Sequence, residues 1–338
     1  MTRLTVIIPG CNTPANLWQR CLGSAIVACG ENDEIICVDD GSDIVPEELE
    51  DFSKRYSCIR LLRFDKNKGQ SAARNAALGM SRGEWVAFLD SDDEVLPGVY
   101  DKCIKPGRTA DVVVFGVRTI WPREKMFRQD VLEDEELGTM SAESARRLYD
   151  NHLIEYVWNK IYSRDFLLRN RISFAEGVCP GEDTIFNLDC AINGARWHIV
   201  GDVGYNYYRM DGTSLSRYLP RRKASLQMKA ERWKLFADKV GDSQALIADL
   251  SVFTEKDAEM AEWDNMWRKG APFDLKERMH FVFARKDILQ VRPLVEFVNR
   301  CVRSIVRKYL YFGWVYKLHI RRYYRDLARY NGTHGGRK

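Results

Sequence analysis

The sequence lacks any run of eighteen consecutive apolar residues, so no segment is expected to cross a membrane as a helix. Its first apolar run covers only residues 4–8 and ends at Pro9, which is too short for the apolar core of a signal peptide. From these two absences we expect a protein that works in the cytoplasm.

The spacings typical of metal sites and disulfide frameworks are also missing. None of the nine cysteines stands in a Cys-x-x-Cys pair, and the five histidines form no His-x-x-x-His pair. A structural zinc site and a secreted disulfide scaffold are therefore disfavoured. We expect the cysteines to be reduced thiols that pack as small core residues.

The chain shows little overall charge imbalance, with a net charge of +4 over 338 residues, but the charge is unevenly distributed. From Arg300 to Lys338 there are eleven Lys or Arg residues and one acid, Asp326, so this tail carries +10 and the rest of the chain −6. A basic tail on a slightly acidic body suggests that the tail meets an anionic partner.

Short apolar runs alternate with helical patterns over the first ninety residues. Apolar, β-branched runs occur at residues 4–9, 35–39, 59–64 and 85–89, and again at 111–117. Helical spacing occupies residues 17–30, 46–55 and 71–80 between them. This alternation predicts an α/β fold with a mostly parallel, Rossmann-like sheet and helices on both faces.

Polar loops follow three of the predicted strands, at residues 9–12, 39–42 and 90–93. Each loop alone is typical of an ordinary turn, but open parallel sheets bind ligands beyond the carboxyl ends of their strands. In extended chain, Asp90 and Asp92 point to the same side, so both carboxylates can face one hard cation. Mg²⁺ and Mn²⁺ prefer such oxygen ligands and keep positions open for substrate phosphates.

The loops and strands together resemble a family 2 glycosyltransferase with the GT-A fold. The matching segments are residues 6–12 (VIIPGCN), 38–42 (VDDGS), 67–69 (NKG) with 73–75 (ARN), 88–93 (FLDSDD), 157–162 (VWNKIY), 181–186 (GEDTIF) and 207–209 (YYR) with Ser214. The resemblance is best over residues 1–100 and continues to about 217. One departure is Cys11, where the family commonly has an aromatic residue.

The resemblance implies an inverting transfer of a sugar from a nucleotide diphosphate donor, expected to be a UDP-sugar. The acceptor would be a hydroxyl of a glycan or of a polyprenyl-diphosphate-linked molecule, in the synthesis of surface polysaccharide or glycolipid. The resemblance implies that the donor is bound by Pro9, Cys11, Asn12, Asp40, Gly69, Arg74, Asp90 and Ser91. It also implies that Asp92 and Asp93 bind Mn²⁺ or Mg²⁺.

The catalytic base is assigned by the same resemblance to Asp183, and acceptor or diphosphate contacts to Trp158, Lys160, Glu182, Arg209 and Ser214. Plain structural roles are the alternatives. Arg74 could form a surface ion pair, and Trp158 could belong to the core. Glu182 and Asp183 could do no more than complement a helix N-terminus.

The expected organisation is a nucleotide-sugar-binding half at 1–100, an acceptor-binding half at 101–220 and a helical extension at 221–338. Residues 295–330 form a basic amphipathic pattern that suits an anionic membrane surface, here the inner face of the plasma membrane. The same face could instead pack on its own domain or form a homodimer. No nucleic-acid-binding motif accompanies it, so nucleic acid is not an expected partner.

Two other functions remain open at this point. A non-catalytic carbohydrate- or nucleotide-binding module could keep the same fold. An Asp-dependent phosphatase is a second and weaker alternative. It is considered because residues 88–92 (FLDSD) resemble the Asp-x-Asp of haloacid dehalogenases. A nicotinamide enzyme is poorly supported, since no Gly-x-Gly-x-x-Gly follows the first strand.

Overall fold

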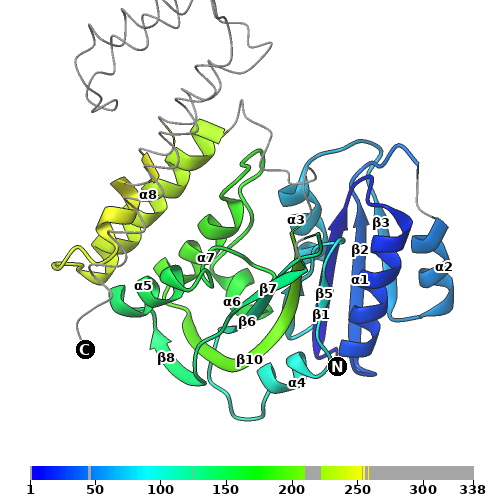
Figure 1. Cartoon of the computed structure of the whole chain (residues 1–338), viewed down its shortest axis with the longest axis horizontal. Coiled ribbons are helices and arrows are strands. Elements are labelled where there is room, and N and C mark those ends of the chain that lie inside the picture. The colour runs from blue at the N-terminus through cyan, green and yellow to red at the C-terminus, as the bar shows by residue number, and fades with distance from the viewer. Residues whose placement is uncertain are drawn as a thin grey trace, which may run out of the picture. The chain divides into compact units, whose positions relative to one another are not determined.

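The computed structural model describes residues 2–44, 47–123, 125–209, 222–252, 254, 255 and 258. In this part of the chain, a ten-stranded sheet carries helices on its faces (Figure 1). The strands are β1 (Leu4–Gly10), β2 (Asp33–Asp39), β3 (Ile59–Arg63), β4 (Trp85–Phe88), β5 (Glu94–Val95), β6 (Val112–Trp121), β7 (Met126–Asp130), β8 (Glu135–Thr139), β9 (Lys160–Ser163) and β10 (Arg196–Tyr208). The helices are α1 (Ala15–Ala28), α2 (Glu47–Arg55), α3 (Gln70–Met80), α4 (Val99–Cys103), α5 (Ala142–Asp150), α6 (Arg164–Arg169), α7 (Glu182–Ile192) and α8 (Arg222–Val240).

The first four strands form the parallel part of the sheet that the sequence predicts. Their order is β3-β2-β1-β4, and every pairing among them is parallel. Because β2 and β4 flank β1, the right-handed connections place α1 and α2 on one face and α3 on the other. The strand order therefore reverses between β1 and β4, and open α/β sheets bind ligands in the crevice beyond the carboxyl ends of the strands at such a point.

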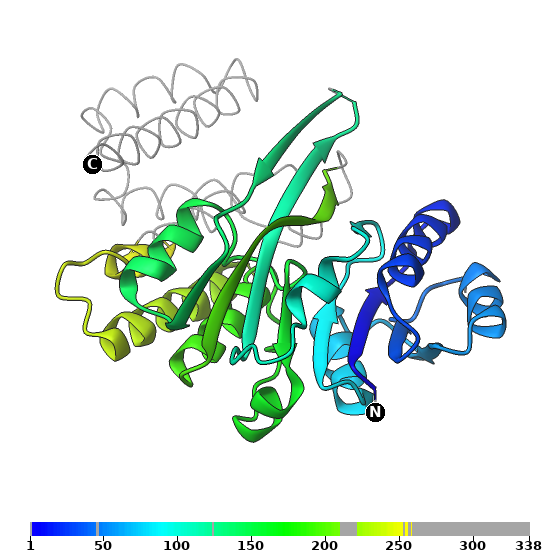
Figure 2. The same cartoon turned by 90° about the horizontal axis from the view of Figure 1, so that it is seen from below.

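Beyond β4 the sheet is mixed. Strand β9 lies antiparallel between β4 and β6, and β10 runs parallel to β6. The two-residue strand β5 pairs with β10, which draws the loop after β4 against the second half of the sheet. Figure 2 shows the hairpin of β6 and β7 extending away from the other strands, with Met126 and Phe127 exposed near its tip.

Burial of β1 and β2 on both faces explains why their sequences are continuous apolar runs. All the apolar side chains of β1 and β2 are buried, as expected for parallel strands covered on both faces. An aromatic cluster joins this half to the next: the rings of Phe174 and Phe186 stack at 4.2 Å, and Phe88 meets both edge-on. Such offset and edge contacts add to the burial of the rings themselves.

Several sequence expectations can be compared directly with these residues. The eight cysteines in the described part of the chain are all free, and four of them are buried, as predicted. No helix among the described residues has both the length and the apolar character needed to cross a membrane. The basic amphipathic segment 295–330 lies outside the described residues, as do Cys301 and most of the predicted extension.

Candidate active site

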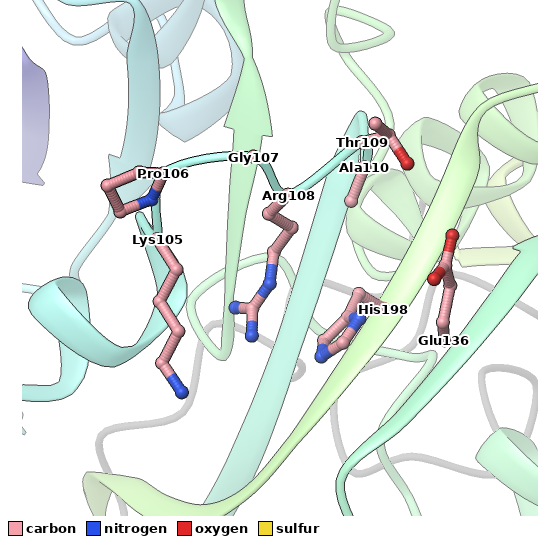
Figure 3. A pocket seen from close by; sticks show the side chains of 8 residues that line it. All are labelled: Lys105, Pro106, Gly107, Arg108, Thr109, Ala110, Glu136 and His198. Atoms are coloured by element: carbon pink, nitrogen blue, oxygen red, sulfur yellow. The ribbon is translucent and has the colours of Figure 1, made fainter.

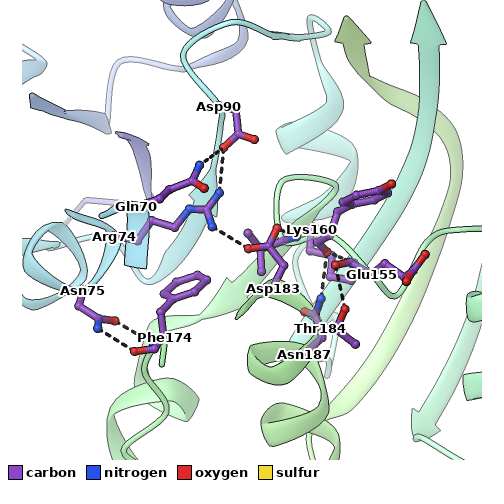
Figure 4. A network of polar contacts seen from close by, with 12 residues as sticks. Gln70, Arg74, Asn75, Asp90, Glu155, Lys160, Phe174, Asp183, Thr184 and Asn187 are labelled. Atoms are coloured by element: carbon purple, nitrogen blue, oxygen red, sulfur yellow. Dashed lines mark hydrogen bonds and ion pairs between the residues drawn. The ribbon is translucent and has the colours of Figure 1, made fainter. Parts of the chain in front are cut away.

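The site is centred on Asp90, which follows β4 at the edge of the ligand crevice. Two side chains one helical turn apart on α3 donate to the same Asp90 Oδ1 atom: Gln70 Nε2 at 2.9 Å and Arg74 Nη2 at 2.8 Å (Figure 4). Burial raises the pKa of Asp90 to about 6, although Arg74 opposes this shift. The Asp90 carboxyl is therefore held in one place by two donors on one helix face.

Arg74 also reaches the helix that carries the predicted base. Its Nη1 atom lies 2.6 Å from Asp183 Oδ1, and its side chain is only 1% exposed. Burial disfavours the charged guanidinium, but Asp183, Asp90 and Glu182 outweigh it and raise the pKa of Arg74. The sequence placed Arg74 on the diphosphate, with a solvated ion pair as the alternative. The structure shows a buried bridge between two carboxylates instead.

Asp183 lies in the first turn of α7, after the αL residue Gly181 at the N-cap. Its second oxygen, Oδ2, accepts the Val157 N–H at 3.3 Å, and its side chain is 15% exposed. The carboxylate thus has two fixed donors and an open side. The helix N-terminus adds favourable interaction with negative charge, so the structural role considered from sequence is present.

Glu182 differs from its neighbour. Burial and the nearby Asp183 raise the pKa of Glu182 to about 7. No ion pair joins Glu182 to another side chain of the described residues, whereas Asp183 is paired with Arg74. Two adjacent carboxyl groups therefore have different electrostatic environments at the start of one helix.

The loop after β4 carries two more carboxylates, those of Asp92 and Asp93, and they have different surroundings. Asp93 is 1% exposed, and its oxygens accept the Tyr205 hydroxyl at 3.0 Å and the Tyr208 N–H at 2.8 Å. Asp93 therefore fastens the loop to β10. The Asp92 carboxylate forms no such bond with another described side chain, although its carbonyl oxygen accepts from Arg20. Ser91 in turn shares a hydroxyl–hydroxyl bond of 2.7 Å with Thr13.

This arrangement limits how a divalent cation could bind. In the described part of the chain, no three His, Cys, Asp or Glu side chains gather into a possible metal site. Mg²⁺ and Mn²⁺ can be held by one or two carboxylates when substrate phosphates and water supply the other ligands. The residues fit such a site through Asp92, and Asp93 is already committed to β10.

The loops after β1 and β2 form the predicted nucleotide side. Both oxygens of the buried Asp40 carboxylate accept backbone N–H groups, from Lys68 at 2.7 Å and Gly69 at 2.8 Å. Gly41 adopts φ +68°, and a Cβ there would lie 2.3 Å from the carbonyl carbon of Lys66. Only glycine allows this close approach, so Asp40 and Gly41 together hold the 66–69 segment.

The β1 loop is tied to the β2 loop by Asn12. The Asn12 N–H donates to Ser42 Oγ at 2.8 Å, and its side chain exchanges two hydrogen bonds with Asp43. Pro9 is buried in β1, and Cys11 is half-buried beside Asn12. The structure therefore brings Pro9, Cys11 and Asn12 to the same crevice edge as the loop after β2.

Two residues predicted to line the cleft are buried instead. Trp158 is 3% exposed and stacks on Tyr205 at 4.2 Å and on Tyr156 at 4.5 Å. The fully buried Lys160 donates to the carbonyl oxygens of Leu153 and Tyr156. Burial lowers the pKa of Lys160 to about 7. Trp158 thus lies in the core, as the alternative considered from sequence had it, and the Lys160 ammonium is bonded to backbone carbonyl oxygens and does not face open space.

The last predicted contacts lie at the end of β10. Arg209 follows the strand and is exposed, and Ser214 lies outside the described residues. The residues that sequence reasoning missed are Gln70 and Tyr205, which bind Asp90 and Asp93. The spacing of Gln70 and Arg74 by four residues could have indicated one shared helix face.

A cavity of about 240 Å³ lies elsewhere in the fold (Figure 3). It is lined by Lys105, Pro106, Gly107, Arg108, Thr109, Ala110, Glu136 and His198. Residues 105–110 precede β6, and β6 runs parallel to β10 and antiparallel to β9. The cavity therefore sits at the amino end of β6, away from the carboxyl ends where Asp90 lies.

Comparison with known proteins identifies the family. Residues 5–169 match the sequence profile of Glycosyl transferase family 2. This chain contains a family 2 glycosyltransferase domain. The match spans the loops after β1, β2 and β4 together with Arg74. The phosphatase alternative is set aside on this finding.

Curated relatives agree with this family. The chain is 29% identical over 228 residues to the uncharacterized glycosyltransferase YibD of Escherichia coli K12, covering 64% of this chain and 63% of the relative. It is 31% identical over 228 residues to the succinoglycan biosynthesis protein ExoO of Rhizobium meliloti, covering 64% of this chain and 63% of the relative. The chain thus spans somewhat less than two thirds of the length of these relatives.

The solved structures show the fold. TarS of S. aureus, residues 1–349 in complex with UDP-GlcNAc, superimposes with a TM-score of 0.57 at 20% identity. The superposition covers 86% of this chain and 82% of that chain. The family 2 domain described here therefore has the GT-A fold, as the sequence predicted.

Proposed function

We propose that this chain is an inverting glycosyltransferase that moves a sugar from a UDP-sugar to a hydroxyl of a glycan or lipid-linked acceptor. The product would belong to a bacterial surface polysaccharide or glycolipid. The observation that carries the proposal is the bridge from Asp90 through Arg74 to Asp183, with N···O distances of 2.8 and 2.6 Å. It links the carboxylate at the end of β4 to the candidate base on α7.

The donor and pathway are inferred from the relatives. TarS has been crystallised with UDP-GlcNAc and with UDP. Other relatives are the succinoglycan biosynthesis protein ExoO and a poly(ribitol-phosphate) β-glucosyltransferase of Bacillus spizizenii, 25% identical over 236 residues. For uracil recognition, Asp40 keeps unused acceptor capacity, because a carboxylate offers about four lone-pair sites and two are occupied by N–H groups.

The proposed reaction is a single displacement. In this proposal, Asp183 takes the proton of the acceptor hydroxyl while that oxygen attacks the anomeric carbon. The bond from the anomeric carbon to the diphosphate oxygen breaks on the opposite face, so the configuration inverts. A divalent cation bound by Asp92 and the diphosphate would supply positive charge for the departing oxygen. Arg74 and the Val157 N–H keep the base oriented through both of its oxygens.

Thermal unfolding with UDP, GDP, dTDP and CDP, each with Mn²⁺ or EDTA, tests the donor site. A ligand at a hundred times its dissociation constant adds about 2.7 kcal/mol of stability. We expect a shift with UDP that requires Mn²⁺. A shift with another nucleotide would overturn the proposed donor. The non-catalytic module would be favoured if UDP binds but no UDP is released from any UDP-sugar with a glycan acceptor.

A further inference from the structure

Helix α8 carries three polar residues on one face, and each binds a different segment around the proposed base. Ser225, Lys229 and Arg232 are spaced by four and three residues, so they share a side of the helix. The apolar residues Trp233 and Phe236 are buried, so α8 is packed on the domain. This helix lies outside residues 5–169, the segment that matches the family.

The first contact fixes the segment that leads into α7. Ser225 Oγ accepts the Cys179 N–H at 2.9 Å and donates to the Cys179 carbonyl oxygen at 3.2 Å. Cys179 lies two residues before Gly181, the N-cap of α7. Farther along, Arg232 Nε lies 2.7 Å from Asp189 Oδ1 on α7. Helix α8 therefore holds both the start and the middle of the helix that carries Asp183.

The second contact fixes the loop on the other side of Asp183. Lys229 Nζ lies 2.9 Å from Glu155 Oε1, and the two side chains are 13% and 25% exposed. Burial alone would raise the pKa of Glu155, but Lys229 and His152 lower it to about 2. Two residues farther on, Val157 donates its N–H to Asp183.

The backbone between these points is firmly held. Carbonyl oxygens of residues 153–156 accept hydrogen bonds from four side chains: Asn159, Lys160, Thr184 and Asn187. Together with these bonds, the Lys229–Glu155 ion pair fixes where the loop presents the Val157 N–H to Asp183. Figure 4 shows this network beside Asp183.

We propose that α8 positions the base: Lys229 and Ser225 hold the two segments on either side of Asp183 and thereby set the direction of its carboxylate. Lys229 is a positioning residue, because it acts through Glu155 and Val157. The inference rests on the proposed role of Asp183. It assigns to α8, which follows the base in the sequence, the part of holding that base in place.

The test compares Lys229→Met with Lys234→Met, an exposed lysine on the same helix. UDP release from UDP-GlcNAc, UDP-glucose and UDP-galactose is measured with Mn²⁺ in the full chain. We expect kcat to fall about tenfold or more in Lys229→Met, because small misplacements of a reacting group are costly, while KM for the donor changes less than about twofold. Lys229→Arg should restore most of kcat, and Lys234→Met should match the wild type.

Hydrogen exchange at the Val157 amide gives a readout that does not depend on turnover. It should accelerate in Lys229→Met and remain unchanged in Lys234→Met. Wild-type kcat or wild-type exchange in Lys229→Met would overturn the positioning role, as would an equal loss in Lys234→Met. Failure of the proposed function has a different result: Asp183→Asn would then release UDP as fast as the wild type.

Discussion

The Arg74 guanidinium lies 2.6 Å from the Asp183 carboxylate, although 109 positions separate the two residues in the sequence. The same side chain binds Asp90 from within a single buried site. Arg74 is therefore a shared partner for a carboxylate that follows β4 and one that lies on α7. Its planar fork of donors suits two carboxylates at once, which a lysine cannot match.

Arg74→Met should destabilise the protein strongly. It leaves two partly buried carboxylates without their shared cation, a change that typically costs about 3–5 kcal/mol. Arg74→Lys keeps the charge but not the planar set of donors, and its loss of stability should be smaller. Urea unfolding measures both, with Arg169→Met as the control because that arginine forms an exposed ion pair with Asp165. A loss below about 1 kcal/mol in Arg74→Met would contradict the bridge, since exposed ion pairs contribute no more than that.

Asp183→Asn should abolish most of the turnover and leave donor binding intact. The amide keeps the shape of the side chain but cannot take a proton, and general-base assistance is worth about 10²–10⁴ in rate. Steady-state UDP release gives kcat, and the thermal shift with UDP reports binding. Asp165→Asn on the exposed face of α6 is the matched control. An unchanged kcat in Asp183→Asn would remove Asp183 as the base.

Asp92 and Asp93 should behave differently despite their adjacency. Asp92→Ala should keep the fold but lose the Mn²⁺-dependent part of the UDP shift. Asp93→Ala should lower stability by about 1–3 kcal/mol, because it leaves the Tyr205 hydroxyl and the Tyr208 N–H unpaired in a buried place. Calorimetry with UDP, with and without Mn²⁺, separates the two effects. Equal loss of the Mn²⁺ response with an unchanged unfolding temperature in both variants would place both carboxylates on the metal.

The raised pKa of Glu182 predicts that the stability of the protein depends on pH. Its pKa is about 7 in the folded protein and 4.5 for the ordinary group, so the folded state binds more protons between these values. The contribution of Glu182 to the free energy of unfolding is therefore fully present below about pH 4.5. It is lost as the pH rises through about 7. Glu182→Gln should flatten this part of the stability–pH curve measured by urea unfolding.

The exposed Glu47 on α2 provides the comparison for this effect. Glu47→Gln should reproduce the wild-type dependence between pH 4.5 and 7. If Glu182→Gln shows the same slope as the wild type, Glu182 does not carry the effect, and the other buried carboxyls at the site, Asp90 first, would have to explain it.

Asn75 should contribute stability without affecting the donor site. Its side chain accepts the Phe174 N–H at 2.8 Å and donates to the Phe174 carbonyl oxygen at 2.9 Å. Asn75→Ala leaves both backbone groups unpaired and should cost about 1–3 kcal/mol. Differential scanning calorimetry measures the loss against Asn16→Ala on the exposed start of α1. A weaker UDP shift at saturating UDP in Asn75→Ala would mean that Asn75 acts on the donor site after all.

The parallel half of the fold could be predicted because its sequence signals are local. Residues 4–9, 35–39 and 85–89 are apolar runs, and they form β1, β2 and β4 within two residues of the expected bounds. Strands β9 and β10 of the mixed part of the sheet were not predicted as strands. Their segments were used only as family motifs, since a four-residue strand such as β9 leaves a weak pattern.

The site was predicted at the level of loops and less well at the level of side chains. The positions of Asp90, Asp92 and Asp183 follow from strand ends and a helix start, which are local features. The burial of Lys160 and Arg74 depends on carbonyl oxygens and carboxylates elsewhere in the chain. Charged residues are almost never fully buried without such partners, so exposure was the reasonable expectation from sequence.

Arg74 and Asn75 are consecutive residues on α3, yet each binds the other half of the domain, one through Asp183 and the other through Phe174. This short stretch of helix therefore adds two side-chain contacts to the pairing of β4 with β9, which already joins the two parts of the sheet. A shift of α3 would therefore move both contacts at once, the one to the candidate base through Arg74 and the one to the backbone of Phe174 through Asn75. A chimera joined after residue 100 needs an incoming carboxylate to meet Arg74 and an incoming backbone amide to meet Asn75.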